Sequence, residues 1–212
     1  MTLKKKNPRG RPAQSAKKKE NIRNKIVSVS KDLFINDGFE NISIRKIAQK
    51  AGCIPRTIYY YFENKRALLH YLWVDIFIML NNECRKATKG IDTPIEIIQE
   101  IYKTYVYYWI EHPDQFRVIF MIEDLNATLD QDAVILDRII SSAEFIQIFE
   151  QAIDTCIENK IFHELNTNLL IQTFFLSAHG LASGLITMRE IKWENSDALI
   201  QNILNALVTG LK

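Results

Sequence analysis

Glycine and proline are scarce in this chain, which has seven glycines and five prolines among its 212 residues. A sandwich or barrel of short strands needs many turn residues of these two types, so their scarcity disfavours an all-β fold. Cysteine is scarcer still, with Cys53, Cys84 and Cys156 and no CxxC spacing. This pattern argues against a disulfide framework or a cysteine zinc site, and it fits a reducing compartment. We therefore expect a mainly helical protein of the cytoplasm.

Uninterrupted hydrophobic runs of membrane-spanning length are also missing. The apolar segment Ala67–Leu80 is too short to span a bilayer and contains His70 and Asp75. The segment Asn168–Met188 is long enough, but polar residues interrupt it, and a buried helix explains it better than lipid does. Because the N-terminus is basic and no apolar stretch follows it, we expect neither a signal peptide nor a membrane partner.

The distribution of charge divides the chain into a basic part and an acidic part. Residues 1–66 carry 17 Lys and Arg against 5 Asp and Glu, whereas residues 67–212 carry 10 against 20. Residues 1–19 alone hold eight cations and no acid. Such an asymmetry indicates that the N-terminal part meets a polyanion and that the remainder does not.

Apolar residues recur at helical spacing along most of the chain after residue 20, and no segment shows the alternation of a strand. The predicted fold class is therefore all-α. Helices are expected over residues 21–37, 44–51, 55–61, 65–86, 94–111, 114–124, 132–140, 143–159, 166–189 and 195–211. Residues 1–19 lack this periodicity and are expected to form a disordered basic arm.

The segment Ser43–Phe62 has the pattern of a helix-turn-helix. A short helix capped by Ser43 is followed by a turn that opens with Gly52, a residue expected to adopt positive φ. A second short helix then begins at Pro55 and presents side chains that donate hydrogen bonds or stack. These are Arg56, Thr57, Tyr60 and Tyr61. Such a face suits the major groove of DNA.

The positions of this motif continue over residues 20–70. They are Ile26, Leu33-Phe34, Gly38-Phe39, Ile42-Ser43-Ile44, Ile47-Ala48, Ala51-Gly52, Thr57-Ile58-Tyr59-Tyr60-Tyr61-Phe62, Lys65 and Leu68-Leu69. In these positions the sequence resembles the N-terminal domain of the tetracycline-repressor (TetR/AcrR) family of bacterial transcriptional regulators. Cys53-Ile54-Pro55 and Tyr61 depart from residues common in that family, which leaves the base preference open.

The resemblance implies a role for each matching residue of the helix-turn-helix. Ser43, Tyr59 and Lys65 would contact DNA phosphates. The residues that would approach base edges are Arg45, Arg56, Thr57, Tyr60 and Tyr61. Three of these roles have a structural alternative, since Arg45 and Arg56 could be solvated surface charges and Tyr59 could pack against the long fourth helix.

A further contact with DNA is expected from the arm. Arg9-Gly10-Arg11-Pro12 is similar to the core of an AT-hook, in which an extended Arg-Gly-Arg lies in a narrow A·T minor groove. Arg9 and Arg11 would then be DNA-binding residues. The alternative is a tail that only increases solubility.

Enzymatic motifs are missing from the sequence. Gly180-Leu-Ala-Ser-Gly184 lacks the spacing of a nucleophile elbow, the four histidines form no metal-binding pair, and no phosphate-binding glycine pattern is present. We expect no catalytic residue, no metal site and no cofactor. Aromatic residues of the C-terminal half are candidates for an effector pocket, with plain core packing as the alternative. They are Tyr105, Tyr108, Trp109, Phe120, Phe175 and His179.

The sequence thus predicts three parts. They are the arm at residues 1–19, a TetR-type DNA-binding domain at 20–80 with its helix-turn-helix at 43–62, and a helical dimerisation and ligand-binding domain at 81–212, joined to it by a long helix. The expected protein is a transcriptional regulator, a ligand-responsive repressor that binds a palindromic operator in double-stranded DNA as a homodimer and answers to an unknown small-molecule effector. The alternative is a constitutive DNA-architectural or protein-partner module without an effector.

The expected dimer interface combines two apolar segments of the C-terminal part. Residues 168–188 contain small side chains that let another helix approach closely. Residues 195–211 carry an apolar stripe at helical spacing, formed by Leu199, Ile203, Leu204, Leu207 and Val208. Two such helices from each subunit would form a four-helix interface about a two-fold axis.

Overall fold

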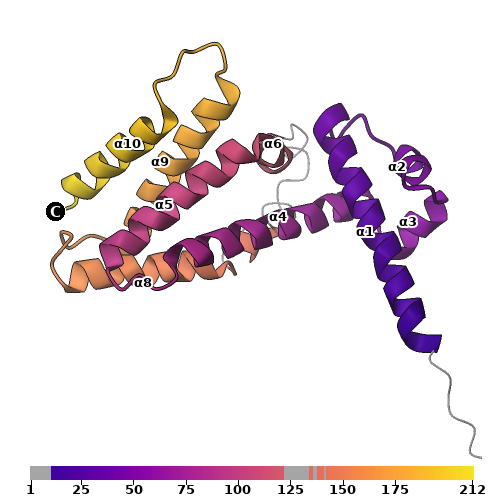
Figure 1. Ribbon diagram of the computed structural model, residues 1–212, viewed down its shortest axis with the longest axis horizontal. Coiled ribbons are helices and arrows are strands. Elements are labelled where there is room, and N and C mark those ends of the chain that lie inside the picture. The colour runs from indigo at the N-terminus through magenta and orange to yellow at the C-terminus, as the bar shows by residue number, and fades with distance from the viewer. Residues whose placement is uncertain (1–10, 122–133, 136–137, 141) are drawn as a thin grey trace, which may run out of the picture. The chain divides into compact units, whose positions relative to one another are not determined.

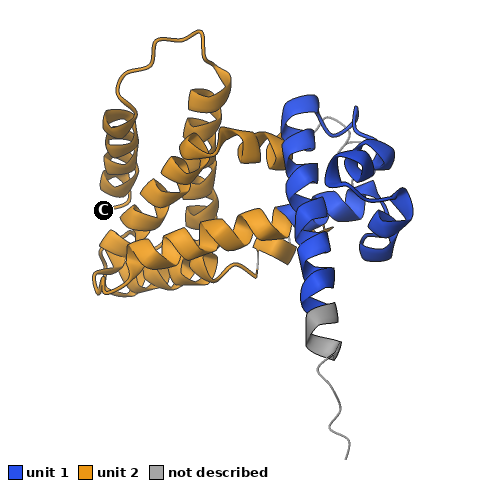
Figure 2. Cartoon of the chain, turned by 45° about the vertical axis from the view of Figure 1, so that its right-hand side comes forward, with its two compact units in different colours: residues 1–72 blue, residues 73–212 orange. Residues whose placement is uncertain are grey.

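The computed structural model describes residues 11–121, 134–135, 138–140 and 142–212, with side chains from residue 16 onward. The chain divides into two compact units, Met1–Leu72 and Trp73–Lys212 (Figure 2). The division falls inside helix α4 (Lys65–Thr88), whereas the sequence places it at residue 80. Every regular element in the described residues is a helix, which confirms the predicted fold class.

The N-terminal unit consists of α1 (Arg11–Asp37), α2 (Ile44–Ala51), α3 (Pro55–Tyr61) and the first turns of α4. Ser43 caps α2 by accepting a hydrogen bond from the backbone N–H of Lys46 at 3.2 Å. Gly52 ends the same helix in the left-handed conformation, with φ 70°. Pro55 occupies the first turn of α3, where its missing N–H costs no helical hydrogen bond. The predicted cap and turn residues therefore all take their expected places.

The helices of this unit each bury one face in a shared core. Ile47 of α2 and Ile58 of α3 are completely buried. The other large buried side chains of this core are Ile26, Leu33, Phe34, Phe39, Ile42, Phe62, Leu68 and Leu69. Because α2 and α3 have only eight and seven residues, tertiary packing rather than local propensity keeps them helical.

Helix α1 is longer than the sequence analysis predicts. It begins at Arg11, so the prediction of a disordered arm is wrong for residues 11–19, while residues 1–10 lie outside the described part of the chain. The physical reason lies in composition, because Ala, Gln and Lys are good helix formers even where no apolar face is present. Pro12 is compatible with this helix because it lies in the first turn.

The C-terminal unit is built around α5 (Pro94–Glu111), which contacts α6 (Pro113–Phe120), α8 (Glu144–Glu158), α9 (Thr167–Thr187) and α10 (Ser196–Gly210). Figure 1 shows α9 and α10 side by side, consistent with their mutual contacts. The helix expected over 114–124 ends at Phe120, and residues 122–124 lie outside the described part. The helix expected over 132–140 is described only at 134–135 and 138–140, which are helical.

Helix α9 is long and apolar enough to cross a membrane by length and composition alone. It packs on α5, α8 and α10, and 28% of its apolar window is buried within the chain. The prediction of a buried helix is therefore only partly met, because much of the surface of α9 has no cover in the single chain.

The left-handed turn at Gly52 predicts an asymmetric response to alanine. Gly52→Ala forces a Cβ into positive φ and should lower the free energy of unfolding by about 1–2 kcal/mol. Gly210→Ala, at the end of α10 where nothing lies within 4 Å of the added Cβ, is the matched control and should change stability little. Urea unfolding at one protein concentration measures both, and equal effects would contradict this account of the turn.

Candidate nucleic-acid interface and effector cavity

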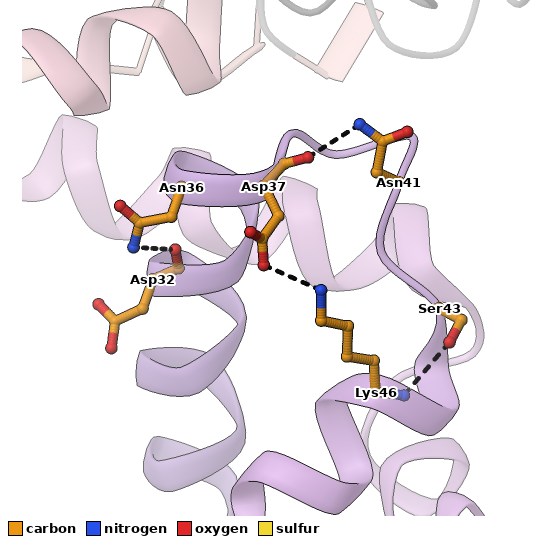
Figure 3. Close-up of polar contacts among 6 residues, drawn as sticks. All are labelled: Asp32, Asn36, Asp37, Asn41, Ser43 and Lys46. Carbon is orange, nitrogen blue, oxygen red and sulfur yellow. Dashed lines mark hydrogen bonds and ion pairs between the residues drawn. The ribbon is translucent and has the colours of Figure 1, made fainter.

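Polar contacts fix the turn between α1 and α2 (Figure 3). Lys46 Nζ lies 3.0 Å from Asp37 Oδ2, and Asn41 Nδ2 donates to the Asp37 carbonyl at 2.9 Å. Gly38 supplies the positive φ, 79°, that lets the chain leave α1. The N-terminus of α2, with Ser43 at its cap, is thereby held in one orientation.

Ser43 is exposed at this cap. Its Oγ accepts from the Lys46 backbone N–H, so the hydroxyl hydrogen remains free to donate to a DNA phosphate. The free N–H groups at a helix start also favour an anion. The position of Ser43 suits the phosphate contact that the sequence predicts, and that contact stays a prediction.

The exposed face of α3 carries the side chains expected to meet bases. Ile58 alone is buried, Arg56 is exposed, and Thr57 and Tyr61 are half-buried. Tyr60 is 66% exposed, and its ring contacts that of Tyr61 edge-on with 5.0 Å between centroids. The helix therefore offers a guanidinium and aromatic hydroxyl groups on its outer side.

Tyr59 lies on the surface of α3 and not in the core. Its side chain is 56% exposed, so packing against the fourth helix does not account for it. A phenol hydroxyl at such a position can donate to a phosphate. The phosphate contact is thus the better of the two interpretations.

Arg45 and Arg56 are both exposed, and neither has an ion-pair partner among the described residues. The segments Ile44–Ala51 and Pro55–Tyr61 contain four Lys and Arg and no Asp or Glu. No acidic side chain within these two helices cancels their positive charge, and this charge attracts the phosphate backbone of DNA.

Lys65 has a different environment from the one implied by the resemblance. Its Nζ donates to the Phe39 carbonyl at 2.8 Å and lies 4.1 Å from the centre of the Phe39 ring. The half-buried ammonium therefore ties the start of α4 to the beginning of the α1–α2 turn. A phosphate contact would use only the remaining donors of this ammonium.

Lys19 is a candidate interface residue that the sequence analysis did not identify. Its Nζ donates to the Tyr60 hydroxyl at 3.0 Å, and this hydrogen bond raises the pKa of Lys19. The contact joins α1 to the recognition helix α3 across 41 positions of sequence. The sequence contains no signal for this contact, because it forms only if α1 extends through Lys19, which the sequence analysis assigned to the disordered arm.

The structure describes only part of the proposed AT-hook. Arg9 lies outside the described residues, and Arg11 is the first residue of α1. The extended conformation expected for Arg9-Gly10-Arg11-Pro12 is therefore wrong at Arg11 and Pro12, which are helical.

A cavity of about 400 Å³ lies among α5, α8 and α9. This volume falls within the range of roughly 300–1,000 Å³ typical of small-molecule sites. Of the predicted effector residues, Tyr105 and Phe175 line it. His179 lies behind them, with Nδ1 3.0 Å from the Tyr105 hydroxyl.

The remaining predicted effector residues do not line this cavity. Trp109 and Phe120 form an aromatic cluster with Phe116 and His179, in which the Phe120 and His179 ring centres are 4.6 Å apart. Tyr108 is directed elsewhere and donates to Gln115 Oε1 at 2.8 Å. For Trp109, Phe120 and Tyr108, core packing is therefore the better interpretation.

Several residues that line the cavity were not predicted from the sequence. Phe145, Ile146 and Phe149 come from α8, and Asn168 and Gln172 come from the first turns of α9. The apolar ones have ordinary helical spacing, so nothing in their sequence separates them from core residues. Among the described residues, no group of three His, Cys, Asp or Glu could hold a metal ion.

Comparison with solved structures shows the fold over nearly the whole chain. The fatty acid degradation regulator FadR from Bacillus halodurans matches with TM-score 0.72 at 18% identity, covering 97% of both chains. A TetR family transcription regulator from Marinobacter aquaeolei VT8 matches with TM-score 0.70 at 19% identity, covering 92% of this chain and 98% of that one. The ketosteroid transcriptional regulator KstR2 of Mycobacterium tuberculosis matches with TM-score 0.63 at 16% identity, covering 90% and 94%.

The family of the DNA-binding region follows from its sequence. Residues 26–72 match the family described as bacterial regulatory proteins, tetR family, and no curated protein matches the chain. These residues include α2, the Gly52 turn and α3, so the match covers the helix-turn-helix described above. Residues 26–72 therefore form the DNA-binding domain of the TetR family of bacterial regulatory proteins, a family of transcription regulators and not of enzymes.

Proposed function

We propose that this protein is a ligand-responsive repressor of the bacterial cytoplasm that binds a palindromic operator as a homodimer. The outer face of α3 carries the proposal, because Arg56, Tyr59 and Tyr60 are exposed on a helix held by a buried Ile58. A recognition helix of this kind enters the major groove, and a two-fold dimer places two of them about 34–36 Å apart, one helical turn of DNA.

The proposed dimer interface uses the uncovered side of α9. Leu169 is 52% and Leu176 66% exposed, and Gly180 and Ser183 continue the same face of the helix. Exposed leucines beside small residues favour a second helix that packs closely. An isologous contact of this face would provide the two-fold axis that a palindrome requires.

Helix α10 contributes a narrower face than the sequence predicts. Leu204 and Val208 are buried inside their own chain together with Ile200, so they belong to the subunit core. Leu199, Ile203 and Leu207 remain partly exposed. The apolar stripe of the sequence thus divides into a core face and a face available to a partner.

The cavity among α5, α8 and α9 supports the effector part of the proposal. A constitutive DNA-architectural module has no need of a pocket in its dimerisation part. The cavity shares α9 with the proposed interface, so an occupant would act on the helix that sets the dimer. A ligand that favours one arrangement of this helix would change the separation of the two recognition helices.

The recognition-helix prediction concerns Arg56 and Tyr60. Arg56→Ala and Tyr60→Ala should leave helicity and dimer mass unchanged and weaken operator binding by about 1–3 kcal/mol for each base read directly. Lys89→Ala, which removes an exposed cation outside the DNA-binding domain, is the control and should bind as the wild type does. Fluorescence anisotropy with an operator fragment selected from genomic DNA provides the measurement, and wild-type affinity in both variants would show that another face meets DNA.

The arm prediction concerns salt dependence. Deleting residues 1–16 removes Lys4, Lys5, Lys6, Arg9 and Arg11 but keeps Lys17, Lys18 and Lys19. Each phosphate contact that is lost should make the slope of log K against log salt shallower by about 0.9. Affinity measured at several salt concentrations gives this slope. If the protein that lacks residues 1–16 has the same slope as the full chain, these residues do not contact DNA and form only a solvated tail.

The dimer prediction concerns Leu176. Leu176→Glu puts a charge on the exposed face of α9 and should give a folded monomer with reduced operator affinity. Ile78→Glu, an equally drastic change at a residue of α4 that is 53% exposed, is the matched control and should remain a dimer. Sedimentation velocity and circular dichroism distinguish the outcomes, and a dimeric Leu176→Glu protein would place the interface elsewhere.

A further inference from the structure

We infer that the cavity among α5, α8 and α9 binds an uncharged amphiphile, with its hydrocarbon body enclosed and one neutral polar end group at Asn168 and Gln172. The end group is a hydroxyl, an amide or an ester oxygen. This inference rests on the proposed effector function and names the class of ligand for that site.

The inner wall of the cavity is apolar. Phe145 and Phe149 of α8, Phe174 and Ala178 of α9 and Ile101 of α5 are all buried, with exposed fractions of 8% or less. Side chains of this kind gain nothing from polar ligand atoms, whereas each enclosed methylene group is favoured by about 0.8 kcal/mol. The body of the ligand is therefore hydrocarbon.

The hydroxyl groups of the two tyrosines that line the cavity are already paired. The Tyr102 hydroxyl lies 2.9 Å from Ser177 Oγ, and the Tyr105 hydroxyl lies 3.0 Å from His179 Nδ1. Burial raises the pKa of Tyr105 and lowers the pKa of His179, so both side chains are neutral at pH 7. Neither pair supplies a charge to a ligand.

No Lys, Arg, Asp or Glu is among the described residues that line the cavity. A carboxylate or an ammonium group drawn inside would lose its hydration without gaining a partner of opposite charge. The cavity therefore discriminates against charged end groups of either sign. A charged relative of the ligand binds only if its end group stays in water.

The two amide side chains of the lining provide the remaining polar contact. Asn168 and Gln172 are exposed and lie four residues apart on α9, hence on one face of the helix. Neither side chain has a hydrogen-bond partner among the described residues. A primary amide both donates and accepts, which matches a hydroxyl, an amide or an ester.

The N-terminus of α9 lies next to Asn168 and favours an anion through its helix dipole. A carboxylate already lies at this helix start, because Asp154 Oδ1 accepts from the Thr167 hydroxyl at 2.6 Å. The Leu169 N–H is also taken, since it donates to Asn166 Oδ1 at 3.1 Å. The negative charge of Asp154 opposes the helix dipole and repels a second carboxylate. A neutral end group remains the better match.

Calorimetric titration of the full-length protein at pH 7 tests the inference with three matched series. The probes are 1-octanol and 1-decanol, octanoate and decanoate, and octyl- and decyltrimethylammonium. We expect 1-decanol to bind about fifteenfold more tightly than 1-octanol, from two added methylene groups. We expect each charged probe to bind at least tenfold more weakly than the alcohol of the same length.

Two variants connect the binding to this cavity. Ala178→Leu takes up cavity space and should weaken decanol binding at least tenfold. Gln172→Ala changes only an exposed side chain, so it should fold normally, and loss of its hydrogen bond should weaken binding about three- to tenfold. Gln147→Ala, at an exposed glutamine of α8 outside the cavity lining, is the control and should leave binding unchanged.

Three results would overturn the inference: decanoate or decyltrimethylammonium binding as tightly as 1-decanol, no binding of any probe, or wild-type decanol affinity in Gln172→Ala.

Operator affinity measured with and without saturating 1-decanol separates this inference from the proposed function. Decanol binding that leaves operator affinity unchanged supports the ligand class and contradicts the effector role. Decanol binding that weakens operator affinity supports both.

Discussion

The burial of Ile47 and Ile58 is the constraint on which the DNA-binding surface depends. Each lies on a helix of eight residues or fewer, and such short helices are unstable in water without tertiary contacts. With these two side chains fixed in the core, helical geometry determines which neighbours face outward. Arg56 and Tyr60 are exposed because Ile58, between them, is not. Loss of the core would therefore remove the interface without any change in its own residues.

The elements that the sequence predicts well are those whose signals are local. Ser43 as a cap, Gly52 in the left-handed conformation and Pro55 in a first turn each depend on chemistry within four residues. Residues 11–19 were misjudged because the prediction relied on apolar periodicity, and this segment has helix propensity without such a pattern. The contact of Lys19 with Tyr60 was then out of reach, because it requires α1 to extend past residue 20.

The cavity illustrates a different limit of prediction. Tyr105 and Phe175 were identified because aromatic residues gather in their segments, whereas Phe145 and Phe149 look like ordinary core residues of an amphipathic helix. Which of these side chains meet across a cavity depends on how α5, α8 and α9 pack, and local periodicity carries no information about that. The same holds for Leu204, whose place in its own subunit depends on the contacts of α10 with α5 and α9.

Helix α9 has two faces with separate tasks, and this division links the cavity to the proposed dimer. Phe174, Phe175 and Ala178 line the cavity, while Leu176 and Gly180 lie on the exposed side. Between them, Ser177 and His179 bond to hydroxyl groups of α5, so the position of α9 is tied to side chains that an occupant would touch. An occupant changes the dimer only if α9 can take two positions and the cavity binds the occupant more tightly in one of them. By the same linkage, DNA that selects the position of α9 disfavoured by the occupant lowers the affinity for the occupant, by the factor by which the occupant lowers the affinity for DNA. A repressor built in this way needs no contact between effector and DNA, since one helix carries both constraints.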